Sequence, residues 1–198
     1  MGLRERQRAF TEETIRLTAV RLFLKQGSRA TTVEEIAELA GISARTFFRY
    51  FDTKEFAALP SLVPFSEAVA QLSPADGSLP GLVAAVDDAI VSVIEEATVL
   101  DAPASRDFFL LLERDAPVRT AAGALYVQLT DILLTSLHRA APETDPLILQ
   151  LLAGNRVAAL QAVWLHSHRL LHEAGWDSTD LERPAAAYRR ALHLLPSC

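Results

Sequence analysis

The stretch GISARTFFRYF, residues 41–51, carries three phenylalanines, one tyrosine and two arginines in its last seven positions. On a helix at 100° per residue, Ala44, Phe47 and Phe51 share one arc, and Phe48 lies at the edge of that arc. The opposite arc holds side chains that donate hydrogen bonds: Arg45, Thr46, Arg49 and Tyr50. Such a face has no carboxylate, and it suits phosphates and the acceptor-rich edge of guanine.

The residues before this stretch predict a helix-turn-helix. Thr32 and Glu35 have the T-x-x-E spacing of a capping box, so a helix of about nine residues should begin there. Gly41 tolerates the positive φ of a tight turn, and Ser43 can cap the helix that follows. In this motif the second helix enters the major groove of DNA, although similar helix pairs also occur in purely structural bundles.

Almost every other segment also has helical periodicity, so we expect an all-α fold. Thr11 can cap a first helix that ends at Gln26, before Gly27. A fourth helix over about 54–72, capped by Asp52 or Thr53, should be bent or interrupted by Pro60 and Pro64. The remaining predicted helices span about 80–98, 104–115, 117–140, 146–174 and 179–195.

Charge divides the chain in two. The 198 residues carry a net charge of −6, but residues 1–55 sum to +2 and residues 56–198 to −8. A single cysteine, Cys198, excludes a disulfide framework and fits a cytoplasmic location. We expect no secretory signal and no membrane-spanning helix, because the start is charged and no long uncharged apolar window occurs.

The pattern T-x-x-x-I-A-x-x-A-G-I-S-x-x-T-F-F-R-Y-F-x-x-K-E, from Thr32 to Glu55, resembles the DNA-binding signature of the TetR (tetracycline-repressor) family. With the first helix, the resemblance covers residues 11–56, about a quarter of the chain. It implies an N-terminal helix-turn-helix DNA-binding domain, residues 1–56, and a larger helical ligand-binding and dimerisation domain, residues 57–198. It also implies a ligand-responsive transcriptional regulator, most often a repressor of a double-stranded DNA operator.

The resemblance implies roles for individual residues. Thr32 and Ser43 would cap helices and contact phosphates, Arg45, Thr46 and Arg49 would read bases, and Tyr50 and Lys54 would hold phosphates. The family often has tyrosine where this chain has Phe48, so a phenolic donor is missing there. The residues Arg4, Arg6 and Arg8 precede the predicted first helix and form either a solvated tail or a further contact to phosphate or the minor groove.

The resemblance also implies that the last two long helices pair with those of a second copy. Two recognition helices must lie roughly 34–36 Å apart to read two half-sites, so a homodimer is expected. The predicted apolar dimer surface consists of Leu149, Leu152, Ala159, Val163, Leu170 and Leu171, with Ala185, Ala186, Ala187 and Leu192 allowing close approach.

A ligand pocket is expected among bulky residues of the middle helices, with a few polar anchors. Its predicted members are Phe108, Phe109, Leu112, Tyr126, Leu129, Asn155, Gln161 and Trp164. The composition favours a small, largely apolar effector, with an acyl chain as one candidate. We expect no cofactor.

Two rival interpretations come from other classes. His168 and His172 have i, i+4 spacing beside His166, which could make a metal or haem sensor, although no acidic or cysteine ligand lies within a turn. A helical enzyme or carrier that has lost DNA binding is the other rival. The sequence lacks G-x-S-x-G, Gly-rich phosphate-loop and H-E-x-x-H patterns, so we predict that it is not an enzyme.

Overall fold

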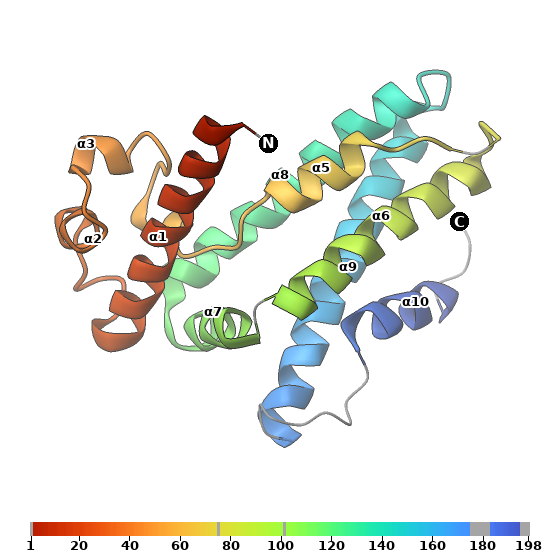
Figure 1. Ribbon diagram of the computed structural model, residues 1–198. Helices are drawn as coiled ribbons and strands as arrows, with labels where there is room; N and C mark the ends of the chain where they lie inside the picture. The colour runs from red at the N-terminus through yellow and green to blue at the C-terminus, as the bar shows by residue number, and fades with distance from the viewer. Residues whose placement is uncertain (1, 75, 101, 175–182, 195–198) are drawn as a thin grey trace. The chain divides into compact units, whose positions relative to one another are not determined.

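The computed structural model describes residues 2–74, 76–100, 102–174 and 183–194, and every regular element in that part of the chain is a helix (Figure 1). The all-α prediction is confirmed. In chain order the helices are α1 (Leu3–Gln26), α2 (Val33–Leu39), α3 (Ala44–Phe47), α4 (Lys54–Ala57), α5 (Val63–Ala70), α6 (Leu79–Leu100), α7 (Ala102–Arg114), α8 (Ala116–Ala140), α9 (Pro146–Ala174) and α10 (Pro184–Leu194). Cys198 and the beginning of the predicted helix 179–195 lie outside the described residues.

The chain forms two compact units, and their limits differ from the predicted domains. Unit 1 comprises residues 1–60 and 103–125, and unit 2 comprises residues 61–102 and 126–198. The first limit falls close to the predicted boundary after residue 56. Residues 103–125, which were expected in the C-terminal domain, group instead with the helix-turn-helix.

In unit 1, α1 packs against α2 and α4, and α2 packs against α3. Ile15, Phe23, Ile36 and Phe47 are buried between these helices. The predicted start of the first helix was wrong, because α1 begins at Leu3 and the Thr11 hydroxyl donates to the Gln7 carbonyl at 2.9 Å inside the helix. Residues 4–8 are arginine, glutamate and glutamine, which favour helix, so the helix begins well before Thr11 although Thr11 is a residue type that can cap a helix.

The predicted helix over 54–72 is two helices, as its prolines suggested. The side chain of Thr53 accepts a hydrogen bond from Phe56 N and so caps α4, which ends at Ala57. Pro60 lies in the break between the helices, and Pro64 lies in the first turn of α5, where a missing N–H costs nothing.

Unit 2 is built around α6, which contacts α5, α9 and α10. Its core contains fully buried aliphatic side chains such as Val86, Ile90 and Leu133. A half-buried ion pair joins α9 to α6 in this unit. The Arg156 guanidinium donates to Asp87 from Nε to Oδ1 at 2.8 Å and from Nη2 to Oδ2 at 3.3 Å. Burial raises the pKa of Asp87 in spite of this arginine.

The structure corrects the predicted dimer surface. Leu149, Leu152, Ala159 and Val163 are buried in the core of their own unit, as are Ala185 and Ala187 of α10. A different stripe of α9 is exposed, at the helical positions Ile148, Leu151, Asn155, Ala158, Ala162 and Leu165. Because α9 is apolar on two sides, its periodicity alone could not tell which side faces its own core. The side chain of Leu171 is outside the described set.

Helix α9 also bears on the expectation that no segment crosses a membrane. Among the described residues, Pro146–Leu170 is long and apolar enough to do so by length and composition, with a mean hydropathy of 1.3. Its Leu149 and Val157 are buried in unit 2, and Arg156 within it is paired with Asp87. These are the features of a core helix.

Candidate nucleic-acid interface

The turn of the helix-turn-helix is closed by hydrogen bonds of the Schellman type. Gly41 N donates to Glu38 O at 3.1 Å and Ile42 N donates to Ala37 O at 2.9 Å, while Gly41 adopts a φ of +70°. Only glycine adopts this backbone region at little cost. The predicted role of Gly41 is therefore confirmed, and the turn fixes the direction in which α3 leaves α2.

Helix α3 is short and begins at a serine cap. Ser43 Oγ accepts a hydrogen bond from Thr46 N at 3.1 Å and also lies 2.9 Å from Thr46 Oγ1. The predicted helix over 44–51 is regular only to Phe47. Beyond it, Arg49 N and Tyr50 N donate to Thr46 O and Phe47 O, three residues back, which tightens the last turn. Residues 43–51 are called the recognition segment below.

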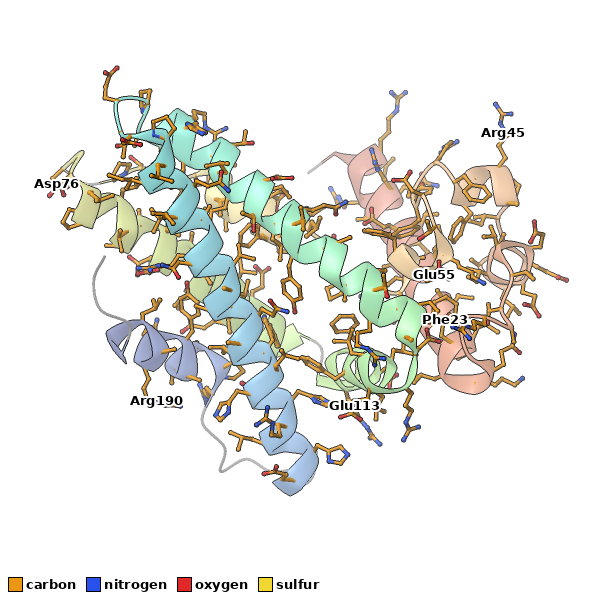
Figure 2. All side chains as sticks on the ribbon, turned by 180° about the vertical axis from the view of Figure 1, so that it is seen from behind. Phe23, Arg45, Glu55, Asp76, Glu113 and Arg190 are labelled. Carbon is orange, nitrogen blue, oxygen red and sulfur yellow. The ribbon has the colours of Figure 1, made fainter. Side chains whose placement is uncertain are left out.

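The recognition segment points its cations outward. Arg45 and Arg49 are exposed, and Thr46 and Tyr50 are half-buried. Figure 2 shows the Arg45 side chain extending from α3 away from the ribbon. This is the arrangement that the helical wheel predicted. DNA contact by these residues remains a prediction.

The apolar side of the segment is anchored by one ring. Phe47 is fully buried, and the rings of Phe48 and Phe51 lie 5.5 Å and 5.8 Å from it between centroids. Phe51 is only half-buried, which is less than predicted. Phe48 is 55% exposed, so its ring lies at the surface beside the exposed Arg45 and Arg49.

Tyr50 lies beside two guanidinium groups. The Arg49 guanidinium carbon is 5.8 Å from the centroid of the Tyr50 ring, and that of Arg8, from α1, is 6.0 Å away. From the sequence, Arg8 was expected either in a solvated tail or in contact with DNA. The structure puts it on a helix and next to the recognition segment.

Helix α2 starts with the predicted capping box. Thr32 Oγ1 accepts from Glu35 N at 3.1 Å, and Glu35 Oε2 accepts from Thr32 N at 2.8 Å. The bond from the Thr32 backbone is the main reason that the pKa of Glu35 falls below its ordinary value. The hydroxyl of Thr32 is thus engaged within the protein, and its predicted phosphate contact stays untested.

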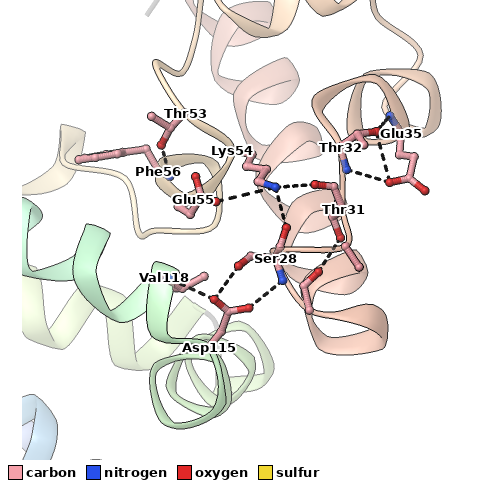
Figure 3. A network of polar contacts seen from close by, with 12 residues as sticks. Ser28, Thr31, Thr32, Glu35, Thr53, Lys54, Glu55, Phe56, Asp115 and Val118 are labelled. Carbon is pink, nitrogen blue, oxygen red and sulfur yellow. Dashed lines mark hydrogen bonds and ion pairs between the residues drawn. The ribbon is translucent and has the colours of Figure 1, made fainter.

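Lys54 has a partner that the sequence did not reveal. Its ammonium donates to the carbonyls of Ser28 at 2.7 Å and Thr31 at 2.6 Å, in the turn between α1 and α2 (Figure 3). Lys54 thus holds this turn, and the phosphate contact that the resemblance implied stays untested.

The same turn is held from the other side by a buried carboxylate. Asp115 Oδ2 accepts from Ser28 N and Oδ1 accepts from Ser28 Oγ, both at 2.7 Å, and Oδ1 also accepts from Val118 N at 3.1 Å (Figure 3). Burial would raise the pKa of Asp115, but the bonds from Ser28 and Val118 outweigh it and the pKa is lowered. Sequence reasoning missed this residue. Asp115 followed by Pro117 is a helix-start pattern, but nothing local indicates Ser28 as a partner.

The helix-turn-helix geometry is matched by known proteins. A family model described as bacterial regulatory proteins, tetR family, matches residues 15–56. The N-terminal part of the chain, residues 15–56, is therefore similar to the DNA-binding domain of TetR-family regulators. The match includes α2, α3 and α4 up to Phe56, and it starts after the first three turns of α1.

Curated relatives match the chain over about a third of its length or less. The HTH-type transcriptional regulator TcmR of Streptomyces glaucescens is 45% identical over 67 residues, which are 34% of this chain and 30% of TcmR. The uncharacterized regulator YerO of Bacillus subtilis is 48% identical over 44 residues, which are 22% of this chain and 15% of YerO. The chain thus matches less than a third of each relative's length.

Solved structures match over most of the chain. One of them is Thermus thermophilus FadR, a TetR family transcriptional repressor solved in complex with lauroyl-CoA. It is 24% identical to this chain, and the match covers 92% of this chain and 92% of FadR with a TM-score of 0.51. At this level of identity, the likeness concerns the fold: an N-terminal helix-turn-helix followed by a larger helical part.

The predicted ligand-pocket residues fall into both compact units. Phe108, Phe109 and Leu112 belong to unit 1, and the other five belong to unit 2. Leu129 is buried in the unit 2 core, with Tyr126 and Trp164 packed against it. Gln161 is half-buried, but Asn155 is exposed on α9 and so does not line the interior, contrary to the prediction. A hollow of about 200 Å³ in unit 1 is lined by other residues: Arg16, Leu17, Val20, Arg21, Leu24 and Asp107.

The histidines of α9 do not converge. His168 is buried, His166 half-buried and His172 exposed, and the rings of His168 and His172 are 6.3 Å apart between centroids. Within the described part of the chain, no group of three or more histidine, cysteine, aspartate or glutamate side chains is placed to hold a metal ion. A metal-sensor interpretation thus gains no support from the described side chains.

The Asp115 contact can be tested by Asp115→Asn. Asparagine has an NH2 donor in place of one carboxylate oxygen, so it cannot accept from Ser28 N at one atom while it accepts from Ser28 Oγ and Val118 N at the other. The free energy of unfolding at pH 7 should therefore fall by about 1–3 kcal/mol in urea titrations followed by circular dichroism. Because the folded-state pKa is lowered, the contribution of the carboxylate is complete above about pH 4 and is lost as the pH falls through that lowered pKa.

The difference between wild type and Asp115→Asn should therefore narrow in acid. Asp131→Asn, at an exposed position of α8, is the matched control and should change stability by less than about 0.5 kcal/mol. Equal effects of the two substitutions at pH 7 would show that the Ser28 contact is not a source of stability.

Proposed function

We propose that the chain is a transcriptional regulator that binds an operator in double-stranded DNA and acts as a repressor. The observation that carries this proposal is the outward cationic face of the recognition segment on a TetR-family helix-turn-helix. Arg45 and Arg49 are exposed there, on a segment whose direction is fixed by the Gly41 turn and the Ser43 cap. We place the protein in the cytoplasm with the DNA and assign it no enzymatic activity.

Recognition divides between bases and phosphates. An arginine can donate two parallel hydrogen bonds to O6 and N7 of guanine in the major groove, and Arg45 in α3 is the best placed to do so. Thr46 lies on the same helix, and its hydroxyl already contacts Ser43 Oγ at 2.9 Å, so it would read a base while held in one orientation. Arg49 and Tyr50 follow at the end of the segment, where phosphates are the nearer target.

The protein acts as a homodimer in this proposal. The exposed stripe of α9 includes the large apolar side chains Leu151 (58% exposed), Leu165 (46%) and Ile148 (40%). Apolar side chains repeated along one exposed helix face mark a surface that another helix covers. The stripe also places Asn155 at its middle, where a polar residue can fix the register of two paired helices.

The effector is proposed to be small and largely apolar, with an acyl chain as one candidate. The composition of unit 2 supports this, since Leu129 is in its apolar core and Tyr126 and Trp164 pack against that core. FadR was solved with lauroyl-CoA, but it is related to this chain only by fold. An effector that binds the DNA-free conformation more tightly shifts the population toward it and releases the operator. A ligand screen on the DNA complex tests this, and release by highly charged metabolites alone would contradict it.

Operator recognition can be tested with the DNA that flanks the protein's own gene and with a duplex selected from a random pool. The wild-type protein should select duplexes that share one defined base sequence. Arg45→Ala should weaken binding to that sequence by about 1–3 kcal/mol in fluorescence anisotropy and relax the preference at one base position. Arg21→Ala, an exposed arginine of α1 outside the recognition segment, is the control. An Arg45→Ala protein with wild-type affinity and the same selected sequence would contradict the placement.

The dimer surface can be tested by Leu151→Glu. A charge on the exposed stripe of α9 should convert a dimer to a monomer in light scattering during size-exclusion chromatography, since a buried unpaired carboxylate is costly. Gln150→Glu adds the same charge to the neighbouring exposed residue outside the stripe and should remain dimeric. If Leu151→Glu stays dimeric as well, the two copies associate through a different surface.

A further inference from the structure

The first turns of α1 bring a third arginine to the recognition segment. Because α1 begins at Leu3, Arg8 lies on a formed helix, and its guanidinium carbon is 6.0 Å from the Tyr50 ring centroid. The family match begins only at residue 15, so Arg8 lies outside the part of the chain that the family defines.

Two like charges meet at one aromatic ring. Arg49 is 5.8 Å and Arg8 6.0 Å from the same centroid, so their guanidinium groups are at most about 12 Å apart, roughly one and a half Debye lengths at physiological salt. Each is attracted by the ring's negative face. Both are exposed, so together they raise the positive potential at the edge of the recognition segment.

An anion beside either arginine is attracted by the combined positive charge of both. Phosphates flank the groove that the recognition segment would enter, and arginine binds phosphate through two parallel hydrogen bonds. Arg4 lies one turn before Arg8 on the same side of α1 and is also exposed, so the cationic strip continues along the helix. The geometry fits a strand of DNA backbone passing from the recognition segment to α1.

We propose that Arg8 binds a backbone phosphate of DNA, and that the Tyr50 ring positions it beside Arg49. The inference rests on the proposed DNA-binding function and adds to it a phosphate site on α1. It also changes the role of Tyr50, from a hydroxyl that holds a phosphate to a ring that holds two guanidinium groups.

The test measures the salt dependence of binding to a random-sequence duplex of about 30 base pairs by fluorescence anisotropy, because phosphate contacts also act in non-specific binding. Arg8→Gln in the full chain should reduce the slope of log K against log salt by about 0.9 for each protomer, the value for one phosphate on B-DNA, and so by about 1.8 for the proposed dimer. Arg21→Gln removes the same charge from an exposed position farther along α1 and should leave the slope unchanged. Equal slopes for Arg8→Gln and wild type would overturn the proposal.

Tyr50 is tested by two substitutions. Tyr50→Phe keeps the ring and should retain the wild-type slope, whereas Tyr50→Leu should lose as much slope as Arg8→Gln. The double variant Arg8→Gln/Tyr50→Leu should lose no more than either single variant, which separates positioning from a general loss of folding. If Tyr50→Phe loses as much as Tyr50→Leu, the hydroxyl is the contact and the ring does not position Arg8.

The same binding measurements distinguish failure of the phosphate site on α1 from failure of the proposed DNA-binding function. A full-length protein that binds no duplex at all contradicts the proposed regulator. A protein that binds duplex DNA with a slope indifferent to Arg8 contradicts only the phosphate site on α1.

Discussion

The turn between α1 and α2 is held by two side chains of opposite charge, and the DNA-binding geometry depends on it. Asp115 accepts the N–H and the hydroxyl of Ser28, while Lys54 donates to the carbonyls of Ser28 and Thr31. Ser28 and Thr31 are almost completely buried, and buried peptide groups without partners are costly. The two charged groups thus replace the hydrogen bonds that a helix or sheet would supply, and they fix where α1 ends and α2 begins.

A fixed α2 allows a short recognition segment to be rigid. With only Ala44–Phe47 in regular α-helix, that segment depends on its ends: the Ser43 cap, the Gly41 turn and the buried Phe47 ring. The arginines on its outer face then need no partner within the segment to be presented outward. Residues 56–198 carry a charge of −8, so if the proposed regulator binds DNA, the favourable charge lies in residues 1–55, which sum to +2.

Much of the candidate nucleic-acid interface could be predicted from local patterns in the sequence. The Thr32 capping box, the glycine turn and the serine cap each depend on residues a few positions apart, so their chemistry can be recognised in the sequence. The Asp115 contact could not be predicted, because its partner lies 87 residues away. The buried side of α9 could not be chosen either, since both sides are apolar, and Asn155 was assigned to the wrong side for that reason. Lys54 was taken as a phosphate ligand because a lysine at a helix start gives no sign of the carbonyls that it meets.

The most direct test of the account is a hydroxyl-radical footprint of the protein on its selected operator, beside an Arg45→Ala/Arg49→Ala double variant. The account predicts two windows of protected backbone whose centres are separated by about one helical turn of DNA, roughly 10 base pairs, or a multiple of it, and predicts that the double variant loses both. Uniform cleavage with the wild-type protein, or two windows that persist in the double variant, would contradict the claim that this cationic segment is the DNA-reading element.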